Sequence, residues 1–562
     1  MNSRAATRRP EEGRTSMEDG KTTQDPSEPL QGAPEGTGGE AASRQPSSGM
    51  PERPAPAAIA NPKADIAALD ELERHLFAHR YAQVGISCYG PSIDPADATR
   101  DRGEALAILE EEDQALLCSP ETGSLLERLS GMGHILSETQ EAQVRILKRD
   151  RARLLDVPSE VQGRLTRLLA ESDDVWRRAK ASGDWASFEP YLDRVVDGMV
   201  KVAKLRRPEL DPYDVWLDDF EHGSDRKLYD SFFSEVKDTV VPLFAEVRAR
   251  GWQPSRTVVE GRFDERRQWE LARDLMELEG LPASKMFLTS TEHPYSDALT
   301  SNYGIIASHV HEDDVVSNVY SMLHEGGHAL YELGVEPSYS YTSLKGGTSS
   351  GMHEAQSRFF ENYVGRDRAF APHLLAAMAK HFRGQLGRVT PNQLYLACNR
   401  AEGSAIRTEA DELTYPLHIL IRYEIEQMLF SGECRAKDVP GIWNAKYKEY
   451  LGVDVRSDSE GALQDTHWAD GLFGYFPTYA LGGAIGAQLR HQMILEGMDW
   501  EGVLASGDLS PVREWLRSRI WRFGRSKDSG ELIQDSCGEP FSARHYTSYL
   551  SEKFSDIYGL RG

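Results

Sequence analysis

Helical periodicity dominates this chain and constrains its fold more than any other feature. Apolar side chains recur at the three-to-four-residue spacing of a helix buried on one side in eight successive stretches of the first half. These stretches are Ala64–Arg80, Arg102–Leu117, Gly123–Leu136, Gln140–Leu155, Ser159–Ser182, Tyr191–Lys204, Lys227–Arg250 and Glu265–Glu279. Strand signals are few, and the best one covers Gly304–Val310. We therefore predict a mainly α fold with one small β element.

The first 60 residues differ from the rest in composition. They contain no aromatic residue and no valine, but eight prolines among Ser, Gly, Glu and Ala. Such a segment cannot bury enough apolar area to offset the entropy that is lost on ordering. We therefore predict a disordered N-terminal extension over residues 1–60, followed by a single helical domain over residues 61–562.

Charge, hydropathy and cysteine use exclude several kinds of partner. The formal net charge of −25 argues against a nucleic-acid partner, because phosphate binding needs a basic surface. No stretch reaches the roughly 20 apolar residues that span a bilayer, so we expect no membrane partner. The five cysteines are odd in number and form no Cys-x-x-Cys pair. This pattern favours a reducing, cytoplasmic compartment.

One predicted helix, over residues 315–333, carries a catalytic pattern. It contains the pentapeptide His-Glu-Gly-Gly-His at residues 324–328. His324 and His328 are four residues apart, so they share a helix face and can bind one divalent ion. Glu325 points about a quarter-turn away, where it can take a proton from a water activated by the ion. The pattern therefore indicates metal-assisted hydrolysis of a peptide bond.

The two glycines inside this helix need an explanation of their own. Gly326 and Gly327 each lower helix stability by about 1 kcal/mol relative to alanine. Two such residues in a buried helix predict that a ligand or a tightly packed element approaches closely at this point.

Spacing alone does not identify the third metal ligand. A catalytic zinc usually takes three protein ligands and keeps one position for water. A second predicted helix, Gly351–Val364, can be capped by Ser349 or Ser350, and it carries Glu354 and Glu361 two turns apart. The full set of downstream candidates is Glu332, Glu336, His353, Glu354 and Glu361.

Six segments in the second half carry a family resemblance. They are His324–Glu332, His353–Arg358, Ile406–Pro416, Gly461–Trp468, Gly474–Tyr479 and Tyr546–Tyr558. In this order they resemble the motifs of the carboxypeptidase Taq family of HExxH metallocarboxypeptidases. The resemblance covers residues 290–560 and is weak in the N-terminal half. It implies a helical fold with a deep active-site groove, a homodimer, and a metal-dependent carboxypeptidase that releases C-terminal residues from short or unfolded peptides.

The resemblance also assigns residues to roles. In this family the second motif supplies the third ligand, so it selects Glu354 to join the two histidines around a divalent ion. Zinc is the expected ion, and cobalt or manganese could also occupy such a site. Catalytic roles fall to Glu325 as the base and to His467 and Tyr475 as donors to the oxyanion. Further residues are expected to line the substrate cleft: His293, Arg407, Gln464 and Tyr479.

Arg407 is assigned to the terminal carboxylate of the substrate. A carboxypeptidase needs a cation there, and arginine can bind a carboxylate through two parallel hydrogen bonds. The alternative is a structural ion pair between Arg407 and either Glu409 or Asp411.

One family motif, Asp-x-Arg-x-Thr, is missing. Counted from His293 with unchanged spacing, its three positions hold Tyr303, Ile305 and Ala307. One expected cation near the substrate is therefore absent. This departure leaves two alternative functions: a metallo-oligopeptidase that cleaves internal bonds, and a catalytically weak peptide-binding protein of the same fold.

Overall fold

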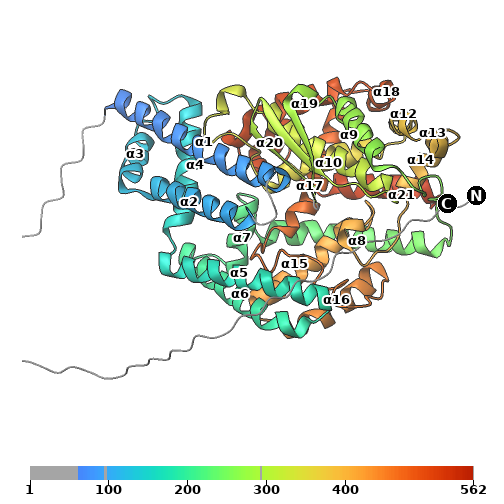
Figure 1. Ribbon diagram of the computed structural model, residues 1–562, viewed down its shortest axis with the longest axis horizontal. Helices are drawn as coiled ribbons and strands as arrows, with labels where there is room; N and C mark the ends of the chain where they lie inside the picture. Colours follow the sequence, from blue (N-terminus) through green and yellow to red (C-terminus); the bar gives the residue numbers. More distant parts are fainter. Residues whose placement is uncertain (1–60, 94–97, 292–293, 561–562) are drawn as a thin grey trace, which may run out of the picture. The chain divides into compact units, whose positions relative to one another are not determined.

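The computed structural model describes residues 61–93, 98–291 and 294–560, so the predicted disordered extension lies outside the described residues. Within these ranges the chain forms 21 α-helices and three β-strands (Figure 1). The mainly α prediction is therefore confirmed. Ala60–Gly562 forms one compact unit. None of the described helices is long and apolar enough to cross a membrane.

All eight helices predicted in the first half are present, together with one short helix, α7. They are α1 (Pro62–Ile93), α2 (Thr99–Cys118), α3 (Pro120–Ser130), α4 (Glu138–Leu155), α5 (Ser159–Ser182), α6 (Trp185–Arg206), α7 (Pro212–Phe220), α8 (Arg226–Ala249) and α9 (Glu265–Glu279). Helices α5 and α9 begin and end at the predicted residues. Helix α3 stops at Ser130 rather than at Leu136.

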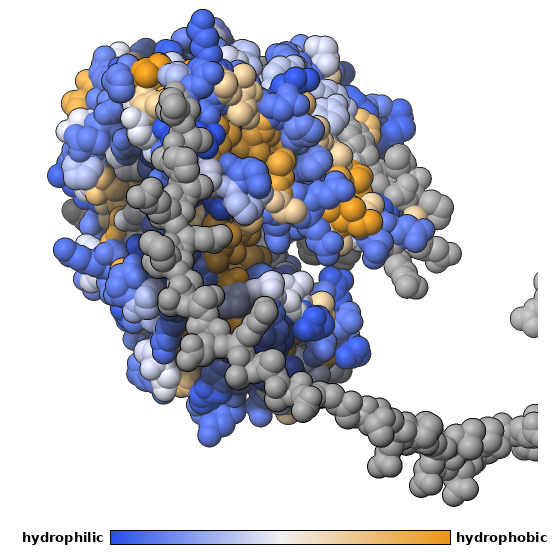
Figure 2. All heavy atoms as spheres, turned by 90° about the vertical axis from the view of Figure 1, so that its left-hand side faces the viewer, coloured by the Kyte–Doolittle hydropathy of each residue, from blue (hydrophilic) through white to orange (hydrophobic). Residues whose placement is uncertain are grey.

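Helices α1–α4 enclose a small hydrophobic core of their own. Its buried members are all aliphatic: Leu69, Leu72, Leu117, Leu125, Leu126, Leu129, Val144 and Leu147. These helices are blue to teal in Figure 1. The later helices share one much larger core. Hydrophilic residues cover most of the face shown in Figure 2, and hydrophobic residues reach that surface in small groups.

The β element is a sheet of three strands in the order β1-β3-β2. Strand β3 (Tyr303–Ser308) lies in the middle, parallel to β1 (Met286–Ser290) and antiparallel to β2 (Tyr295–Thr300). The predicted strand Gly304–Val310 corresponds to β3, whose residues 304–308 are buried. The sequence did not predict β1 and β2.

Helix α10 (Val315–Gly334) follows the sheet and matches the predicted helix over residues 315–333. The side chain of Asp314 caps it by accepting a hydrogen bond from the backbone N–H of Ser317 at 3.0 Å. A Cβ atom on Gly326 would lie 2.0 Å from a carboxyl oxygen of Glu279, the last residue of α9. Close approach of a second helix therefore explains this glycine.

Helix α11 (Ser350–Arg358) begins after a cap by Ser349, whose Oγ accepts a hydrogen bond from the N–H of Met352 at 3.0 Å. It continues as a π-helical segment, η4 (Phe359–Gly365). The prediction of one regular helix over Gly351–Val364 was therefore wrong in its second half. The π turn holds one residue more than an α turn and changes the direction of the side chains that follow.

The remaining helices belong to the same compact unit, and among them α17 packs against α11. They are α12 (Ala371–His381), α13 (Arg383–Leu386), α14 (Pro391–Cys398), α15 (Tyr415–Ser431), α16 (Val439–Lys446), α17 (Phe476–Leu495), α18 (Trp500–Ser506), α19 (Ser510–Arg519), α20 (Ser529–Cys537) and α21 (Arg544–Tyr558), with a 3-10 segment, η8 (Trp521–Ser526), before α20.

Candidate metal centre and active-site cleft

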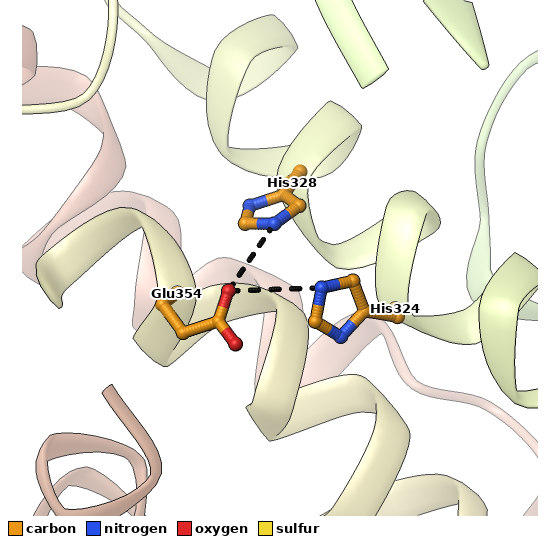
Figure 3. A group of neighbouring side chains, drawn as sticks. All are labelled: His324, His328 and Glu354. Atoms are coloured by element: carbon orange, nitrogen blue, oxygen red, sulfur yellow. Dashed lines mark ion pairs between the residues drawn. The ribbon is translucent and has the colours of Figure 1, made fainter. Parts of the chain in front are cut away.

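Three side chains from two helices converge on one point. His324 and His328 come from α10 and Glu354 from α11 (Figure 3). Nε2 of each histidine lies 3.6 Å from Oε2 of Glu354. Ligand atoms bonded at about 2.1 Å in a tetrahedral site are about 3.4 Å apart, so these three atoms fit a single ion. No other group of His, Cys, Asp and Glu side chains in the described ranges has such spacing.

Glycine contacts bring the surrounding helices to this point. A Cβ atom on Gly327 would lie 2.4 Å from the backbone oxygen of Gln356 on α11. A Cβ atom on Gly482 of α17 would lie 2.6 Å from the Cβ of Glu354. Both distances are shorter than van der Waals contact, so α10, α11 and α17 can cross only where a side chain is missing. The close approach predicted from the glycine pair is confirmed.

Hydrogen bonds orient both histidine rings. Nδ1 of His324 lies 2.9 Å from Oε2 of Glu361, and Nδ1 of His328 lies 2.6 Å from Nδ1 of His353. With Nε2 directed at the site, the two Nδ1–H groups are the donors. His353 then donates from Nε2 to Oε1 of Glu332 at 2.9 Å. Glu361 therefore lies outside the metal site and contacts the candidate ligand His324. Glu354 has the position of the third ligand.

The carboxylate of Glu354 is held by its own helix. Arg358 donates to its Oε1 at 2.8 Å, and the hydroxyl of Ser357 donates to its Oε2 at 3.1 Å. Burial acts to raise the pKa of Glu354, but the positive charges of His324 and Arg358 outweigh it and hold the pKa well below its usual range. Burial lowers the pKa of His328 to about 4. The carboxylate is therefore ionised and His328 neutral at pH 7. Burial acts to lower the pKa of His324, but the charge of Glu354 outweighs it and raises the pKa, and a bound ion would displace that proton.

These residues lie on the wall of a cleft with a volume of about 540 Å³, which agrees with the predicted groove. Glu325, Tyr475 and Tyr479 line the same cleft. Burial raises the pKa of Glu325, although the charge of His324 opposes this effect. A carboxylate with a raised pKa is a better proton acceptor near neutral pH, as a general base requires.

Other predicted residues lie behind this wall, outside the described lining of the cleft. Nε2 of His467 lies 3.2 Å from the hydroxyl of Tyr479. Burial lowers the pKa of His467 to about 3, so its imidazole is neutral at pH 7. Gln464 accepts a hydrogen bond from the backbone N–H of Arg407 at 2.9 Å and donates to two backbone carbonyls. His293 lies outside the described residues.

Arg407 is buried and pairs with neither of its predicted alternatives. Its Nη2 lies 2.9 Å from Oδ1 of Asp465, and its Nη1 donates to the hydroxyl of Tyr415 at 3.3 Å. Arg422 binds the other carboxylate oxygen of Asp465 at 2.5 Å. Two guanidinium groups thus share one carboxylate and leave one positive charge in excess. The Arg407 guanidinium carbon lies 5.1 Å from the ring centre of Tyr479, directly behind the cleft wall.

The positions of the missing Asp-x-Arg-x-Thr motif lie in β3. Ile305 and Ala307 are fully buried, and Tyr303 is half-buried. None of the three lies in the described lining of the cleft. The departure therefore changes the interior of the sheet rather than the cleft wall.

Three residues support the centre without having been predicted in that role: His353, Arg358 and Glu361. His353 and Glu361 were candidates for the third ligand instead. Arg358 lies four residues after Glu354, a spacing that places opposite charges side by side on a helix. This signal was present in the second motif. No comparable signal links Glu361 to His324, because the contact joins two different helices.

Comparisons with known proteins agree with this geometry. The family described as carboxypeptidase Taq (M32) metallopeptidase matches residues 92–554. Carboxypeptidase 1 of Bacillus subtilis is 33% identical over 466 residues, which cover 83% of this chain and 93% of that protein. Thermostable carboxypeptidase 1 of Pyrococcus furiosus is 33% identical over 467 residues, covering 82% and 92% of the two chains.

A solved structure gives the same result. The crystal structure of M32 carboxypeptidase from Deinococcus radiodurans R1 superposes with a TM-score of 0.84 at 31% sequence identity. The match covers 88% of this chain and 100% of that one. Because the match extends over nearly the whole length of these relatives, the chain belongs to the carboxypeptidase Taq (M32) family and is a metal-dependent carboxypeptidase.

Proposed function

We propose that His324, His328 and Glu354 hold a zinc ion and that Glu325 is the general base in the release of C-terminal residues. The observation that carries this proposal is the convergence of three ligand atoms beside a carboxyl group on one cleft wall. When bound, the ion supplies a Lewis acid that polarises the scissile carbonyl and lowers the pKa of a water. Glu325 takes a proton from the attacking water and then gives it to the leaving amine.

We assign the stabilisation of the oxyanion to the tyrosine side of the cleft. Tyr475 and Tyr479 line the cleft, and their hydroxyl groups can donate hydrogen bonds to the negative charge that develops on the carbonyl oxygen. His467 supports Tyr479 from behind, through the contact between Nε2 and the hydroxyl oxygen. Because His467 is neutral, it orients this hydroxyl without adding a charge.

We propose that the positive charge of Arg407 and Arg422, which lies behind Tyr479, binds the terminal carboxylate of the peptide. Arg407 and Arg422 exceed Asp465 by one charge, and both are buried, so water screens this charge weakly. An arginine-to-glutamine change at Arg407 is expected to lower kcat/KM for a peptide with a free C-terminus, but not for its amide. Arg400→Gln is the control, since Arg400 pairs with Glu402 and lies outside the described cleft lining.

Glu325→Gln tests the base. The variant should bind the same amount of metal as the wild type, while kcat falls by roughly 10²- to 10⁴-fold. Metal content is measured by mass spectrometry and turnover with a short peptide that has a free C-terminus. A variant that keeps its rate would refute the assignment.

We further propose a cytoplasmic homodimer that binds no nucleic acid. The cytoplasmic proposal is supported by five unpaired cysteines and the absence of any nucleic-acid partner by the net charge of −25. The homodimer rests on the family resemblance and is tested by light scattering after size-exclusion chromatography. A monomeric mass would overturn it.

A further inference from the structure

Three arginine side chains line the active-site cleft in addition to the metal ligands. Arg149 and Arg153 lie one turn apart on α4, and Arg525 lies in η8. We call these three residues the arginine wall. Apart from the base and the third ligand, the described lining holds one acidic residue, Asp219. The wall is therefore a local excess of cations in a chain with a net charge of −25.

Two of these arginines form ion pairs with acidic residues that lie outside the described lining. Nη1 of Arg149 lies 2.9 Å from Oδ1 of Asp528, and Nη2 of Arg525 lies 3.1 and 3.0 Å from the two carboxylate oxygens of Asp150. A guanidinium group has five N–H donors, and these contacts use only some of them. Both side chains are partly exposed, so N–H donors remain for a ligand in the cleft.

Asp219, the acid in the described lining, is shared between Arg153 of the wall and a further arginine. Asp219 accepts hydrogen bonds from Nη1 and Nη2 of Arg206, both at 2.6 Å, and also pairs with Nε of Arg153 at 3.2 Å. One carboxylate therefore faces two guanidinium groups. Together with the two anchoring acids, the directly bonded set has four guanidinium groups and three carboxylates. A fourth carboxylate, Asp218, also interacts with the charge of Arg153, so carboxylates and guanidinium groups are equal in number here.

The wall lies near the N-terminal end of α11. Oγ of Ser349, the cap of α11, lies 2.6 Å from Oγ of Ser529, and the preceding residue, Asp528, anchors Arg149. The arginine wall and the start of α11 are thus joined through one short segment.

The proposed carboxylate site lies at the other end of the same helix. The guanidinium carbon of Arg358, the last residue of α11, lies 4.2 Å from the ring centre of Tyr415. The hydroxyl of Tyr415 accepts a hydrogen bond from Arg407. Glu354, the third ligand, lies between the two ends. A peptide held at Arg407 and cleaved at the metal must therefore extend towards the arginine wall on its N-terminal side.

Helix geometry sets the distance between the wall and the ion. Ser349 and Glu354 are five residues apart, or about 7.5 Å along the helix axis. An extended peptide advances about 3.3 Å per residue, so it covers this distance in two or three residues. The wall is joined to Ser349 through Ser529 and Asp528, which adds up to one further residue.

We propose that the arginine wall binds an acidic side chain of the peptide, two to four residues on the N-terminal side of the scissile bond. The direction of the peptide rests on the proposed function, which assigns the terminal carboxylate to Arg407. The ligand is a carboxylate, because guanidinium groups bind it through charge-assisted hydrogen bonds.

Peptides that carry one glutamate test this site. Hexapeptides with a free C-terminus and otherwise neutral residues are compared in pairs, with Glu or Gln at each position in turn. We expect kcat/KM to be about five- to tenfold higher for Glu than for Gln at two to four residues before the scissile bond. This ratio should fall at high salt, because exposed charges are screened. A ratio near one at every position would overturn the proposal.

Variants of the arginines test whether the wall is the source of the preference for glutamate. Arg149→Gln and Arg153→Gln should each lower the Glu-to-Gln ratio at these positions. Arg145→Gln should not, because Arg145 is exposed on the same helix and lies outside the described lining. A ratio that stays high in the Arg149→Gln, Arg153→Gln double variant would refute the wall as its source. The all-neutral hexapeptide, with free and amidated C-terminus, separately tests the carboxypeptidase assignment.

If the preference appears only for the residue that is released, the acidic group binds on the other side of the scissile bond and the proposal is wrong. Such a result leaves the metal and the base unaffected. Thermal melting of each variant shows whether it is folded, and the wild-type peptide series gives an answer without any variant.

Discussion

Glu279 offers a sharp test of burial in this fold, because it ends α9 inside the protein core. It is fully buried, and neither of its carboxyl oxygens has a hydrogen-bond partner among the described residues. Burial raises its pKa well above the usual value, and the charge of Arg513 offsets this only in part. In the folded protein Glu279 therefore keeps its proton over a pH range in which a free glutamate, with a pKa of about 4.3, is ionised.

The sign of the effect on stability follows from this difference. Below about pH 4 the carboxyl group is protonated in both states and adds no pH dependence to the stability. As the pH rises, the unfolded chain releases the proton while the folded protein holds it, so the free energy of unfolding falls. The slope is about 1.4 kcal/mol per pH unit, or about 2.7 kcal/mol between pH 5 and 7 if the proton stays bound throughout.

Glu279→Gln removes this titration, because an amide is neutral in both states. We expect the variant to lose about 2.7 kcal/mol less stability than the wild type between pH 5 and 7. Urea unfolding, followed by the fluorescence of the ten tryptophans, measures the free energy at each pH. A chelator is present throughout, so that the pH dependence of metal binding does not contribute.

Glu277→Gln is the matched control, since Glu277 is exposed on the same helix. Its pH profile should run parallel to that of the wild type. A Glu279→Gln profile that is also parallel would show that the buried carboxyl group ionises normally, and the argument from burial would fail.

Three further changes test the centre and its support. Glu361→Gln should weaken zinc binding by roughly 10- to 100-fold in a competition assay with a chelating dye, because the His324 ring loses its charged partner; unchanged affinity would contradict this. Gly327→Ala should lower both metal affinity and the melting temperature, since its Cβ would lie 2.4 Å from the Gln356 oxygen, whereas Gly384→Ala, with open space around it, should change neither. Asp465→Asn should cost about 3–5 kcal/mol in urea unfolding, because it leaves two buried guanidinium groups unpaired; a loss below 1 kcal/mol would refute that pairing.

Local features of the fold were predictable and long-range ones were not. The periodicity of α5 and α9 marks both of their ends, because caps and apolar spacing are local. Strand β3 was predictable because its middle residues are all apolar. Strands β1 and β2 have shorter runs of apolar residues and carry no such signal. The end of α1 at Ile93 rather than Arg80 was also missed, since Gly85, Gly90 and Pro91 are poor helix formers.

In the candidate site, too, local features were predictable and long-range ones were not. The spacing of His324 and His328 suffices to predict a shared ion, because both lie on one helix. Spacing could not choose between Glu354 and Glu361, since both follow the same cap. The choice depends on how α11 crosses α10 and on the π turn after Arg358. Arg407 was predicted to bind the terminal carboxylate of the substrate or to pair with Glu409 or Asp411, but its partner is Asp465. That residue is 58 positions away, and no sequence pattern joins the two.

The glycine crossings at Gly327 and Gly482 have a consequence for the coupling between metal binding and folding. Gly327 fixes the distance between α10 and α11 through backbone contact, and Gly482 lets α17 pack against Glu354, so the ligand atoms are in place before an ion arrives. Small zinc domains, by contrast, use the binding energy of the ion to fold. Here that energy is available as affinity, and the ion stabilises the protein only by mass action. Ions can then be exchanged in the folded enzyme without a cycle of unfolding.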